Sequence, residues 1–368
     1  MGKIKVCHMT SVHGKEDIRI FHKECVSLAQ AGYEVYLVER GESYDKNGVH
    51  IVGVGDIPDS RLKRMTEGSK RVYEAALALD CEIYHLHDPE LLPYGLKLKR
   101  KGKKVVFDSH ELTRKQIKER PYLPKPLLSV ISFFYSLYED FVLSRLDGVI
   151  FPCLVDGKFP LRSKRTALLN NVPRLDELYD KYDPDAEKTP DSICMVGSLF
   201  YERGITHFLK AVHQAGGQAY LGGRFSPASY EEELRSMPEW DCCHFLGFLN
   251  RGQVLDLLRH TRIGCAALLD FGQYYHIENL PTKAYECMAL GLPVILSNTP
   301  YCSRVVREYG FGVCVDPEDI AGYAAAIKRL LDDPALCEEM GRKGRQAVKE
   351  VFNWDTEFQH LLELYRSL

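Results

Sequence analysis

Residues 278–295 read ENLPTKAYECMALGLPVI, a short helical stretch that leads through Gly291 and Pro293 into a buried apolar strand. The same alternation of short β-branched or apolar runs with longer helical stretches continues along the rest of the chain. This order is typical of βα units arranged around a parallel sheet. The sequence therefore predicts an α/β fold, and a length of 368 residues allows two hydrophobic cores.

The βα alternation stops once, between Asn170 and Asp191, where the sequence is polar and punctuated by proline. We therefore expect a first α/β domain over 1–172, a linker over 173–190 and a second α/β domain over 191–351. Ligands bind at the carboxyl ends of strands in such open sheets, so two facing halves would place a site on each wall of a cleft. Strands are expected at 4–9, 34–38, 49–54, 82–85, 104–107 and 148–151, and at or near Ser192–Val196, Ala219, His244, Ile263, Val294 and Gly312.

Four helix starts are indicated by a polar side chain that precedes a proline. Proline is tolerated in the first turn of a helix because no intrahelical hydrogen bond is lost there. The preceding Asp or Thr side chain can accept a hydrogen bond from a free amide of the same turn. The expected starts are Asp88–Pro89, Thr299–Pro300, Asp316–Pro317 and Asp333–Pro334.

The composition, with 45% hydrophobic and 27% charged residues, is that of a soluble globular protein. A net charge of -3 gives no overall attraction to nucleic acid, so no nucleic-acid partner is expected. The twelve cysteines lack zinc-ligand spacing and no secretory signal precedes them, so we expect reduced thiols in a cytoplasmic protein. The longest uncharged apolar run, Leu127–Tyr138, is shorter than the roughly 20 residues of a membrane-spanning helix, and no span is expected.

Two carboxylates, Glu278 and Glu286, frame the stretch quoted above. If a helix begins near Thr282, its free amides and its dipole favour a diphosphate. Glu286, one turn further on, can then accept hydrogen bonds from ribose hydroxyls, and Glu278 can reach an attached sugar. A pair of solvent-facing acidic residues on a helix is the simpler alternative, which the residues around the pair disfavour.

This stretch resembles the retaining GT-B glycosyltransferases of family 4, also called glycosyltransferase group 1. That family has two glutamates separated by seven residues, then a small-residue helix, Gly, Pro and a buried strand. The resemblance implies that Glu286 holds the donor ribose and Glu278 the hydroxyls of the transferred sugar. The family's Gly-Phe-Gly after the first glutamate is replaced here by Asn279-Leu280-Pro281, where Pro281 has no amide to donate. The hydroxyl of Thr282 and the charge of Lys283 are candidate substitutes.

A second family motif, Gly-Arg-Leu followed by Lys-Gly, matches the segment from Gly197 to Gly204. In the family its two cations grip the leaving diphosphate. Arg203 matches the second cation, and a guanidinium suits bidentate phosphate contact. Ser198 stands where the first cation would be, so Lys283 or Arg224 is expected to replace it.

Polar residues also follow three strands in the first half of the chain, around Gly14, His87 and His110. They resemble the acceptor-side loops of family members that have Asp-x-Arg early and His-Asp-Pro-Glu and Asp-x-His-Glu later. The resemblance implies that His110 faces the donor sugar, and Gly14 lets the backbone approach a ligand. Five histidines at strand ends, His8 and His85 among them, favour a site. The expected acceptor-side residues are His13, Asp17, Arg19, His87, Asp88, Glu90 and Glu111.

The resemblance predicts two Rossmann-like domains of the GT-B fold, with a C-terminal helix over 352–368 that crosses back to the first domain. It implies a retaining hexosyl transfer from a nucleotide-diphosphate sugar, UDP- in preference to GDP-, to a carbohydrate or lipid-linked acceptor hydroxyl. Surface polysaccharide or glycolipid biosynthesis is the expected setting. The catalytic residues are expected to be His110, Glu278 and Arg203, with no cofactor and no metal. The expected donor-binding residues are Gly14, Gly197, Ser198, Arg203, Glu278, Asn279, Leu280, Thr282, Lys283 and Glu286.

Three other functions remain open from the sequence. The His-x-His-Asp spacing from His85 to Asp88 would also suit zinc or manganese in a metal hydrolase, although Arg203 and the glutamates would then be unexplained. A GT-B sugar-nucleotide epimerase would use the same fold and donor without an acceptor. A non-catalytic nucleotide-sugar-binding protein is permitted by the replaced cation at Ser198.

A basic segment, 114–126, precedes the apolar and aromatic run Leu127–Tyr138. Basic residues beside such a helix suit peripheral attachment to anionic lipid. The alternative is a helix packed in the core of the first domain. The sequence thus permits, but does not require, a protein at the inner face of a membrane.

Overall fold

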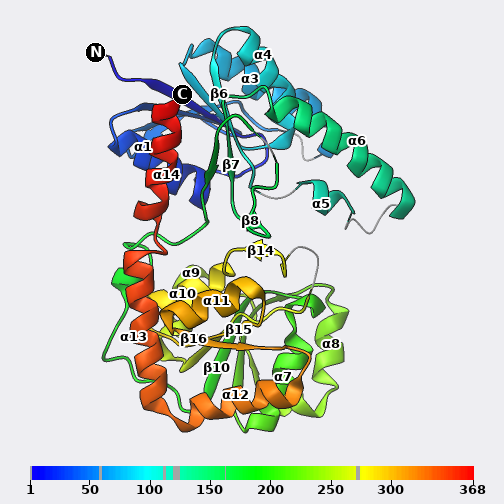
Figure 1. Ribbon diagram of the computed structural model, residues 1–368, viewed down its shortest axis with the longest axis vertical. Coiled ribbons are helices and arrows are strands. Elements are labelled where there is room, and N and C mark those ends of the chain that lie inside the picture. The colour runs from blue at the N-terminus through cyan, green and yellow to red at the C-terminus, as the bar shows by residue number, and fades with distance from the viewer. Residues whose placement is uncertain (1, 58–59, 111–112, 119–124, 162, 271–273) are drawn as a thin grey trace. The chain divides into compact units, whose positions relative to one another are not determined.

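The computed structural model describes residues 2–57, 60–110, 113–118, 125–161, 163–270 and 274–368 (Figure 1). The chain divides into two compact units. The first unit contains residues 1–171 and 357–368, and the second contains residues 172–356. The expected linker, 173–190, is thus part of the second unit, while the end of the chain belongs with the first.

The first unit is built on an eight-stranded sheet in the order β3-β4-β2-β1-β5-β6-β7-β9. Its strands are parallel except for β3, which pairs with β4 in the antiparallel sense. All six strands expected in this half are present within two residues of the predicted bounds, whereas the short β3, β8 and β9 were not predicted. The strands are β1 (Lys5–Met9), β2 (Glu34–Glu39), β3 (Tyr44–Lys46), β4 (Val49–Gly53), β5 (Ile83–Leu86), β6 (Lys104–Asp108), β7 (Gly148–Phe151), β8 (Leu154–Val155) and β9 (Thr166–Leu168).

Helices cover this sheet and bury its apolar side chains, as a parallel sheet requires. The strands β5 and β7 are buried along their whole length. The C-terminal helix α14 contributes Leu361, Leu364 and Tyr365 to the buried interior. The helices are η1 (Ile18–Cys25, a π-helix), α1 (Val26–Gln30), α2 (Arg61–Lys63), η2 (Arg64–Gly68), α3 (Ser69–Ala78), η3 (Pro89–Leu91), α4 (Leu92–Arg100), α5 (Thr113–Lys118), α6 (Lys125–Leu143) and α14 (Trp354–Ser367).

The long helix α6 is mostly exposed, so the interpretation of residues 127–138 as a core helix is wrong. Among the residues that the structure describes, one helix is long and apolar enough to cross a membrane by length and composition alone: its window Pro126–Leu143 is 28% buried. A single helix of this kind does not establish a span. Its exposed apolar side chains are Leu127, Val130, Ile131, Phe133, Phe134, Leu137, Tyr138 and Phe141.

The second unit is built on a six-stranded parallel sheet in the order β12-β11-β10-β13-β15-β16. One buried apolar cluster lies under α7, α8 and α12, and another under α9, α10 and α11. The helices therefore cover both faces of the sheet, as in a Rossmann-like domain. All six expected strands are present. The elements are η4 (Tyr179–Lys181), β10 (Ser192–Leu199), η5 (Tyr201–Arg203), α7 (Ile205–Ala215), β11 (Gln218–Phe225), α8 (Ser229–Arg235), η6 (Pro238–Cys242), β12 (Cys243–Phe245), α9 (Arg251–His260), β13 (Ile263–Cys265), β14 (Ile277–Glu278), α10 (Thr282–Ala289), β15 (Val294–Ser297), α11 (Pro300–Tyr309), β16 (Gly312–Val315), α12 (Ile320–Asp332) and α13 (Pro334–Glu350).

Two of the four predicted helix caps are present. Thr299 accepts a hydrogen bond from the amide of Cys302 at the start of α11, and Asp333 caps α13. The prediction for Asp316 is wrong, because α12 begins later, with Asp319 as its cap. Asp88 precedes η3 but its side chain makes no cap hydrogen bond there. That carboxylate is directed to another loop instead, as described below.

Candidate functional site

The strand order of the second sheet places a crevice beside β10. The chain runs from β10 outward to β11 and β12, and then returns to the other side of β10 to form β13. At such a reversal the connecting loops diverge, which leaves room for a ligand at the carboxyl ends of the strands. A pocket of about 690 Å³ lies there, lined by residues that follow β10, β13, β15 and β16. Its size is that of a typical small-molecule site.

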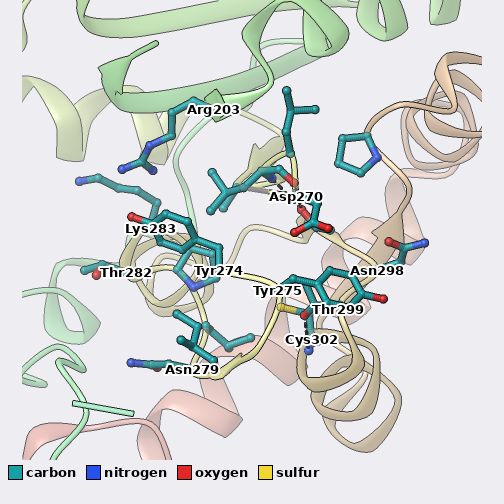
Figure 2. A pocket seen from close by; sticks show the side chains of 18 of the residues that line it. Arg203, Asp270, Tyr274, Tyr275, Asn279, Thr282, Lys283, Asn298, Thr299 and Cys302 are labelled. Carbon is teal, nitrogen blue, oxygen red and sulfur yellow. Dashed lines mark hydrogen bonds between the residues drawn. The ribbon is translucent and has the colours of Figure 1, made fainter. Parts of the chain in front are cut away.

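Seven of the predicted donor-binding residues line this pocket (Figure 2). Arg203 lies at the end of η5, and Thr282 and Lys283 begin α10. The first amides of α10 have no intrahelical carbonyl partner and can donate to a ligand. Cationic side chains and the positive end of a helix therefore line the same pocket. This combination favours an anionic group such as a diphosphate. The seven residues are Gly197, Ser198, Arg203, Asn279, Leu280, Thr282 and Lys283.

Lys283 lies at the position where the second motif lacks its first cation. The Cε atom of Lys283 is 3.9 Å from the position that a Cβ on Gly197 would occupy. Gly197 has a positive φ of 138°, which favours glycine, and it is followed directly by Ser198. The other candidate replacement, Arg224, is exposed, and its guanidinium stacks on Phe248 at 4.5 Å from the ring centre. The local geometry therefore favours Lys283.

Glu286 is buried next to the pocket and is held by two cations. Its carboxylate accepts hydrogen bonds from Lys283 Nζ at 3.0 Å and from Arg251 Nη1 at 3.1 Å. Arg251 begins α9 and also donates to Glu177. Glu286 does not line the pocket itself. The sequence analysis did not find Arg251, because nothing in its local pattern distinguishes it from a surface arginine.

Glu278 lies in β14 and its Oε2 accepts a hydrogen bond from Arg304 Nη2 at 3.1 Å. The neighbouring Asn279 accepts a hydrogen bond from the hydroxyl of Tyr285, at 2.7 Å, which fixes the chain just before α10. Tyr285 itself is buried. Glu278 is thus a partly exposed carboxylate beside the pocket, and Arg304 was a further residue that sequence reasoning missed.

Several polar residues of the pocket were also absent from the prediction. They follow β13, β15 and β16, so the rule that ligands bind at strand carboxyl ends would have indicated their region. No motif marked these side chains as ligand-binding, and Thr299 and Asp316 were predicted only as helix caps. They are Asp270, Tyr274, Tyr275, Asn298, Thr299, Asp316 and Glu318.

In the first unit, Asp88 anchors the loop that follows β1. Its Oδ2 accepts hydrogen bonds from Thr10 Oγ1 at 2.8 Å and from the Ser11 amide at 2.6 Å. Glu90 accepts from Ser11 Oγ at 3.2 Å and from Arg64 Nε at 2.9 Å. These two acidic residues therefore hold the loop that carries His13 and Gly14.

Asp17 and Arg19, which were predicted as acceptor-side residues, are bound by other residues of the first unit. Asp17 caps η1 by accepting from the amides of Arg19 and Ile20, and it also contacts Nδ1 of His13 at 3.2 Å. Arg19 is buried. Its guanidinium donates two 2.9 Å hydrogen bonds to the Asp108 carboxylate in a bidentate arrangement, and one to the Leu169 carbonyl. Its guanidinium is thus committed within the first unit.

The histidines at the strand ends form a chain of contacts that leads to His110. Nδ1 of His8 lies 2.9 Å from Nε2 of His87, and Nδ1 of His87 lies 3.0 Å from Nε2 of His110. Nε2 of His110 is also 3.1 Å from Asp108, and its side chain is 15% exposed. The rings of His13 and His110 are 4.6 Å apart. The structure therefore brings together the predicted histidines; Glu111 lies outside the described residues.

Burial determines the protonation of this cluster. It lowers the pKa of His8 and of His85 well below the usual value, and lowers that of His87 to about 4. Burial likewise raises the pKa of the Glu24 carboxyl well above its usual value. Burial also opposes ionisation of Asp108, but the Arg19 charge and the contacts with His110 and His87 together outweigh it and hold the Asp108 pKa well below normal. At neutral pH the buried imidazoles are therefore uncharged.

Two Rossmann-like domains, the second with a pocket suited to an anionic group at its strand ends, are the architecture of the GT-B fold. Two family models match this chain: Glycosyl transferases group 1 over residues 180–347, and Glycosyltransferase Family 4 over residues 21–156. The chain belongs to this family of glycosyltransferases.

The curated relatives are similar to this chain over only part of their own length. Glycogen synthase of Mycobacterium tuberculosis is 28% identical over 182 residues, which are 48% of this chain and 42% of that protein. D-inositol 3-phosphate glycosyltransferase of Acidothermus cellulolyticus is 38% identical over 92 residues, which are 25% of this chain and 20% of that protein. The chain thus spans less than half the length of these relatives.

Solved structures match along the whole chain. Sucrose-phosphate synthase from Thermosynechococcus elongatus superposes with a TM-score of 0.73 at 19% identity, covering 99% of this chain and 98% of that one. Anabaena HepE, solved in complex with UDP and glucose, gives a TM-score of 0.70 at 13% identity, covering 99% of this chain and 100% of that one. At these identities the likeness shows the fold.

Proposed function

We propose that the protein transfers a hexosyl residue from a nucleotide-diphosphate sugar to an acceptor hydroxyl, with retention of the anomeric configuration. The observation that carries the proposal is the pocket where Arg203, Lys283 and the start of α10 converge. Family membership and the buried Glu286 directly behind Lys283 support it.

The donor diphosphate is proposed to bind between the Arg203 guanidinium and the first turn of α10, where Lys283 supplies the second positive charge. The ribose hydroxyls would donate to Glu286, and the hydroxyls of the transferred sugar to Glu278. UDP is preferred over GDP as the carrier. Support for UDP comes from Anabaena HepE, solved with UDP and glucose, and from an Escherichia coli trehalose-6-phosphate structure bound with UDP-2-fluoro glucose.

In the proposed reaction the bond between the anomeric carbon and the diphosphate oxygen breaks, and the acceptor oxygen bonds to the same face of the sugar. The acceptor proton passes to the departing phosphate, so no carboxylate base is needed. Arg203 and Lys283 would stabilise the negative charge that develops on the leaving group. His110 is proposed to face the donor sugar. The loop that carries His13 is proposed to contact the acceptor.

No divalent metal is proposed to take part in this step. In many phosphoryl-group sites a metal neutralises the phosphate oxygens, and here two cationic side chains and helix amides are placed for the same task. The chemistry would therefore depend on Arg203 and Lys283 where other enzymes depend on magnesium or manganese.

The acceptor is proposed to be lipid-linked or close to a membrane, at the cytoplasmic face, in surface polysaccharide or glycolipid biosynthesis. The support is α6, whose side chains Phe133 and Phe134 are 59% and 64% exposed. Lipid is the proposed occupant of this apolar face because aromatic side chains suit the boundary between headgroups and acyl chains. Of the basic residues expected to assist, Arg114 is already paired with Glu139 and Asp140. The apolar face is thus the larger contribution.

Nucleotide sugars screened for donor hydrolysis and for thermal stabilisation test the assignment. One nucleotide sugar should raise the unfolding temperature and be hydrolysed slowly without acceptor, and NMR should show that the released sugar first has the α configuration of the donor. An isomerised nucleotide sugar would instead indicate an epimerase. Stabilisation with no turnover, even with lipid-linked and free sugar acceptors, would indicate a binding protein.

A further inference from the structure

Strand register gathers three histidines on one face of the first sheet. His8 of β1 is the register partner of His85 of β5, so their side chains project to the same face. His87 follows His85 by two residues, and the period of two in an extended chain returns it to that face. All three rings are buried, with centres 4.5 to 5.1 Å apart; His87 stacks on the other two, which are tilted relative to each other.

Glu24 of η1 places a carboxylate against these rings. Its Oε2 lies 3.9 Å from Nδ1 of both His8 and His85, and 4.0 Å from Nε2 of His87. Glu24 is completely buried, and neither of its oxygens forms a hydrogen bond with a described residue. Nε of Arg19 lies 3.2 Å from Oε1, and the Asp108 carboxyl is also close, while Oε2 lies within 4.0 Å of all three imidazoles. A buried carboxylate with no hydrogen-bond partner is costly, so this arrangement requires a physical explanation.

We propose that His8, Glu24, His85 and His87 bind one structural divalent metal ion, with Zn²⁺ as the best fit. The four ligand atoms all lie within 4.8 Å of one another. Three imidazole nitrogens and one carboxylate oxygen are a four-coordinate set that suits zinc. Tetrahedral bonds of about 2.0–2.1 Å separate the ligand atoms by about 3.3 Å. The His8–His87 pair, at 2.9 Å, is closer than that value, and the three pairs of Glu24 with the histidines, at 3.9 to 4.0 Å, are wider.

The surroundings of His87 fit a metal ligand. Its other ring nitrogen, Nδ1, lies 3.6 Å from Oδ2 of Asp108, whose charge is balanced by Arg19. Histidines that bind metals commonly direct their second nitrogen to a carboxylate, which fixes the ring and raises its basicity. His110 lies on the same side of this ring, 3.0 Å from Nδ1. The ion would therefore hold β1, β5 and η1 together beneath the predicted catalytic histidine.

The hydroxyl of Tyr365 competes for one of the ligand nitrogens, Nδ1 of His85, from which it lies 2.8 Å. Its 3.4 Å contact with His8 is to Nε2, the ring nitrogen that does not face Glu24. A metal-free alternative is thus a buried network in which Tyr365 bonds His85 and Glu24 is protonated. The two arrangements differ in metal content, which can be measured without reference to enzymatic activity. The proposed ion has no open coordination position and lies in the first unit, so it is separate from the donor pocket.

The test is the metal content of the tag-free protein after prolonged dialysis, measured by mass spectrometry of the elements. We expect about one equivalent of zinc per chain, because buried structural sites release their ion slowly. Glu24→Gln should lower the content by more than about tenfold. Tyr365→Phe and His213→Asn, the latter an exposed histidine on α7, should leave it unchanged.

Variant His110→Asn separates this site from the adjoining group of His87, Asp108 and His110. It should retain the zinc; loss in His110→Asn with retention in Glu24→Gln would place the ion at the adjoining group and overturn the proposal. Should Glu24→Gln not fold, wild-type protein produced with Co²⁺ decides, because tetrahedral cobalt gives intense visible bands. Protein from zinc-supplemented cells that contains no metal, and whose unfolding temperature does not change on addition of Zn²⁺, would also overturn it.

Discussion

Nζ of Lys283 lies 3.0 Å from Oε2 of Glu286, one turn further along α10. The lysine side chain also passes over Gly197 at the end of β10. This ion pair therefore connects the proposed ribose carboxylate with the position of the missing family cation. It explains how a chain with Ser198 at that position can still present two positive charges to a diphosphate.

The first prediction concerns these two charges. Arg203→Gln and Lys283→Gln should each weaken binding of a nucleoside diphosphate by about 1.5–3 kcal/mol, the range for charged hydrogen bonds. Binding of the corresponding nucleoside, which lacks phosphate, should change little for Arg203→Gln. Calorimetric titration measures both ligands. Arg342→Gln, an exposed arginine on α13, is the matched control. Equal loss of nucleoside and diphosphate affinity in Arg203→Gln would contradict the assignment.

The second prediction concerns Glu286. Glu286→Ala should weaken nucleotide binding by about 1.5–3 kcal/mol, because the ribose hydroxyls lose their charged acceptor. The 2′,3′-dideoxy nucleotide should bind wild type and variant about equally, since it has no hydroxyls to donate. Glu338→Ala, at an exposed position on α13, serves as control. Unchanged nucleotide affinity in a folded Glu286→Ala protein would exclude the proposed role.

The third prediction is that Mg²⁺ and Mn²⁺ do not assist the donor site. Nucleoside diphosphate affinity should be the same in the presence of either ion and in the presence of EDTA, because Arg203 and Lys283 are proposed to neutralise the phosphates. Turnover should likewise be unaffected by addition of either ion. The measurement is made over minutes, so that a buried zinc ion does not exchange. A strict requirement for added magnesium or manganese would show that the account of the leaving group is wrong.

The sequence predicted the sheets well because each βα unit carries its own local signal. Every strand that was long and apolar, such as β1 and β10, was found; of the three-residue strands, β12 and β13 were found and β3 and β9 were missed. The positions of Gly197, Arg203 and Lys283 at one pocket followed from the strand-end rule and the family motifs. The partners Arg251 and Arg304 could not be predicted, because they approach the glutamates through tertiary packing alone.

The sequence did not predict the buried polar cluster inside the first unit. The alternating pattern placed His8, His85 and His87 at strand ends, but it did not indicate that they are buried. Glu24 was not singled out at all, since in sequence it is one charged residue of an amphipathic helix. The register between β1 and β5 gathers the imidazoles, and the tertiary packing of η1 brings the Glu24 carboxylate against them.

The fourth prediction concerns the stability of the Arg19–Asp108 pair. Arg19→Gln should lower the free energy of unfolding by about 3–5 kcal/mol at pH 7, because it leaves the buried Asp108 charge unpaired. The lowered pKa of Asp108 gives the wild type stability that is complete above the unfolded pKa of about 3.9 and is lost only as the pH falls through the folded value.

Without Arg19, burial raises the pKa of Asp108, so the difference between variant and wild type should shrink as the pH falls towards 4. Urea unfolding at pH 4.5 and pH 7 measures this trend. Arg100→Gln, at an exposed position of α4, should have little effect at either pH. A loss of stability independent of pH would indicate that the pair contributes through packing only.

The fifth prediction concerns the exposed face of α6. The double variant Phe133→Ser/Phe134→Ser should lower co-sedimentation with vesicles containing anionic lipid by more than about tenfold, because two large apolar side chains no longer enter the bilayer. Phe248→Ser removes an aromatic side chain that is also 64% exposed, but from the second unit, and should leave binding unchanged.

Repeating this sedimentation at high salt separates the two contributions. Changing Arg114, Lys115, Lys118, Arg120 and Lys125 to Ser should remove the part that depends on salt, while the apolar part remains. No binding by the wild type in low salt would remove the membrane proposal and leave the transferase assignment intact.

The buried side chains of α14 have a consequence for how the protein is made. Leu361, Leu364 and Tyr365 complete the interior of the first unit, yet the ribosome adds them after the whole of the second unit. The domain translated first is therefore the last to be finished, in reverse of the usual order of co-translational folding. Until those residues emerge, His85 lacks its contact with Tyr365 and the nascent first unit must wait with part of its core open to solvent.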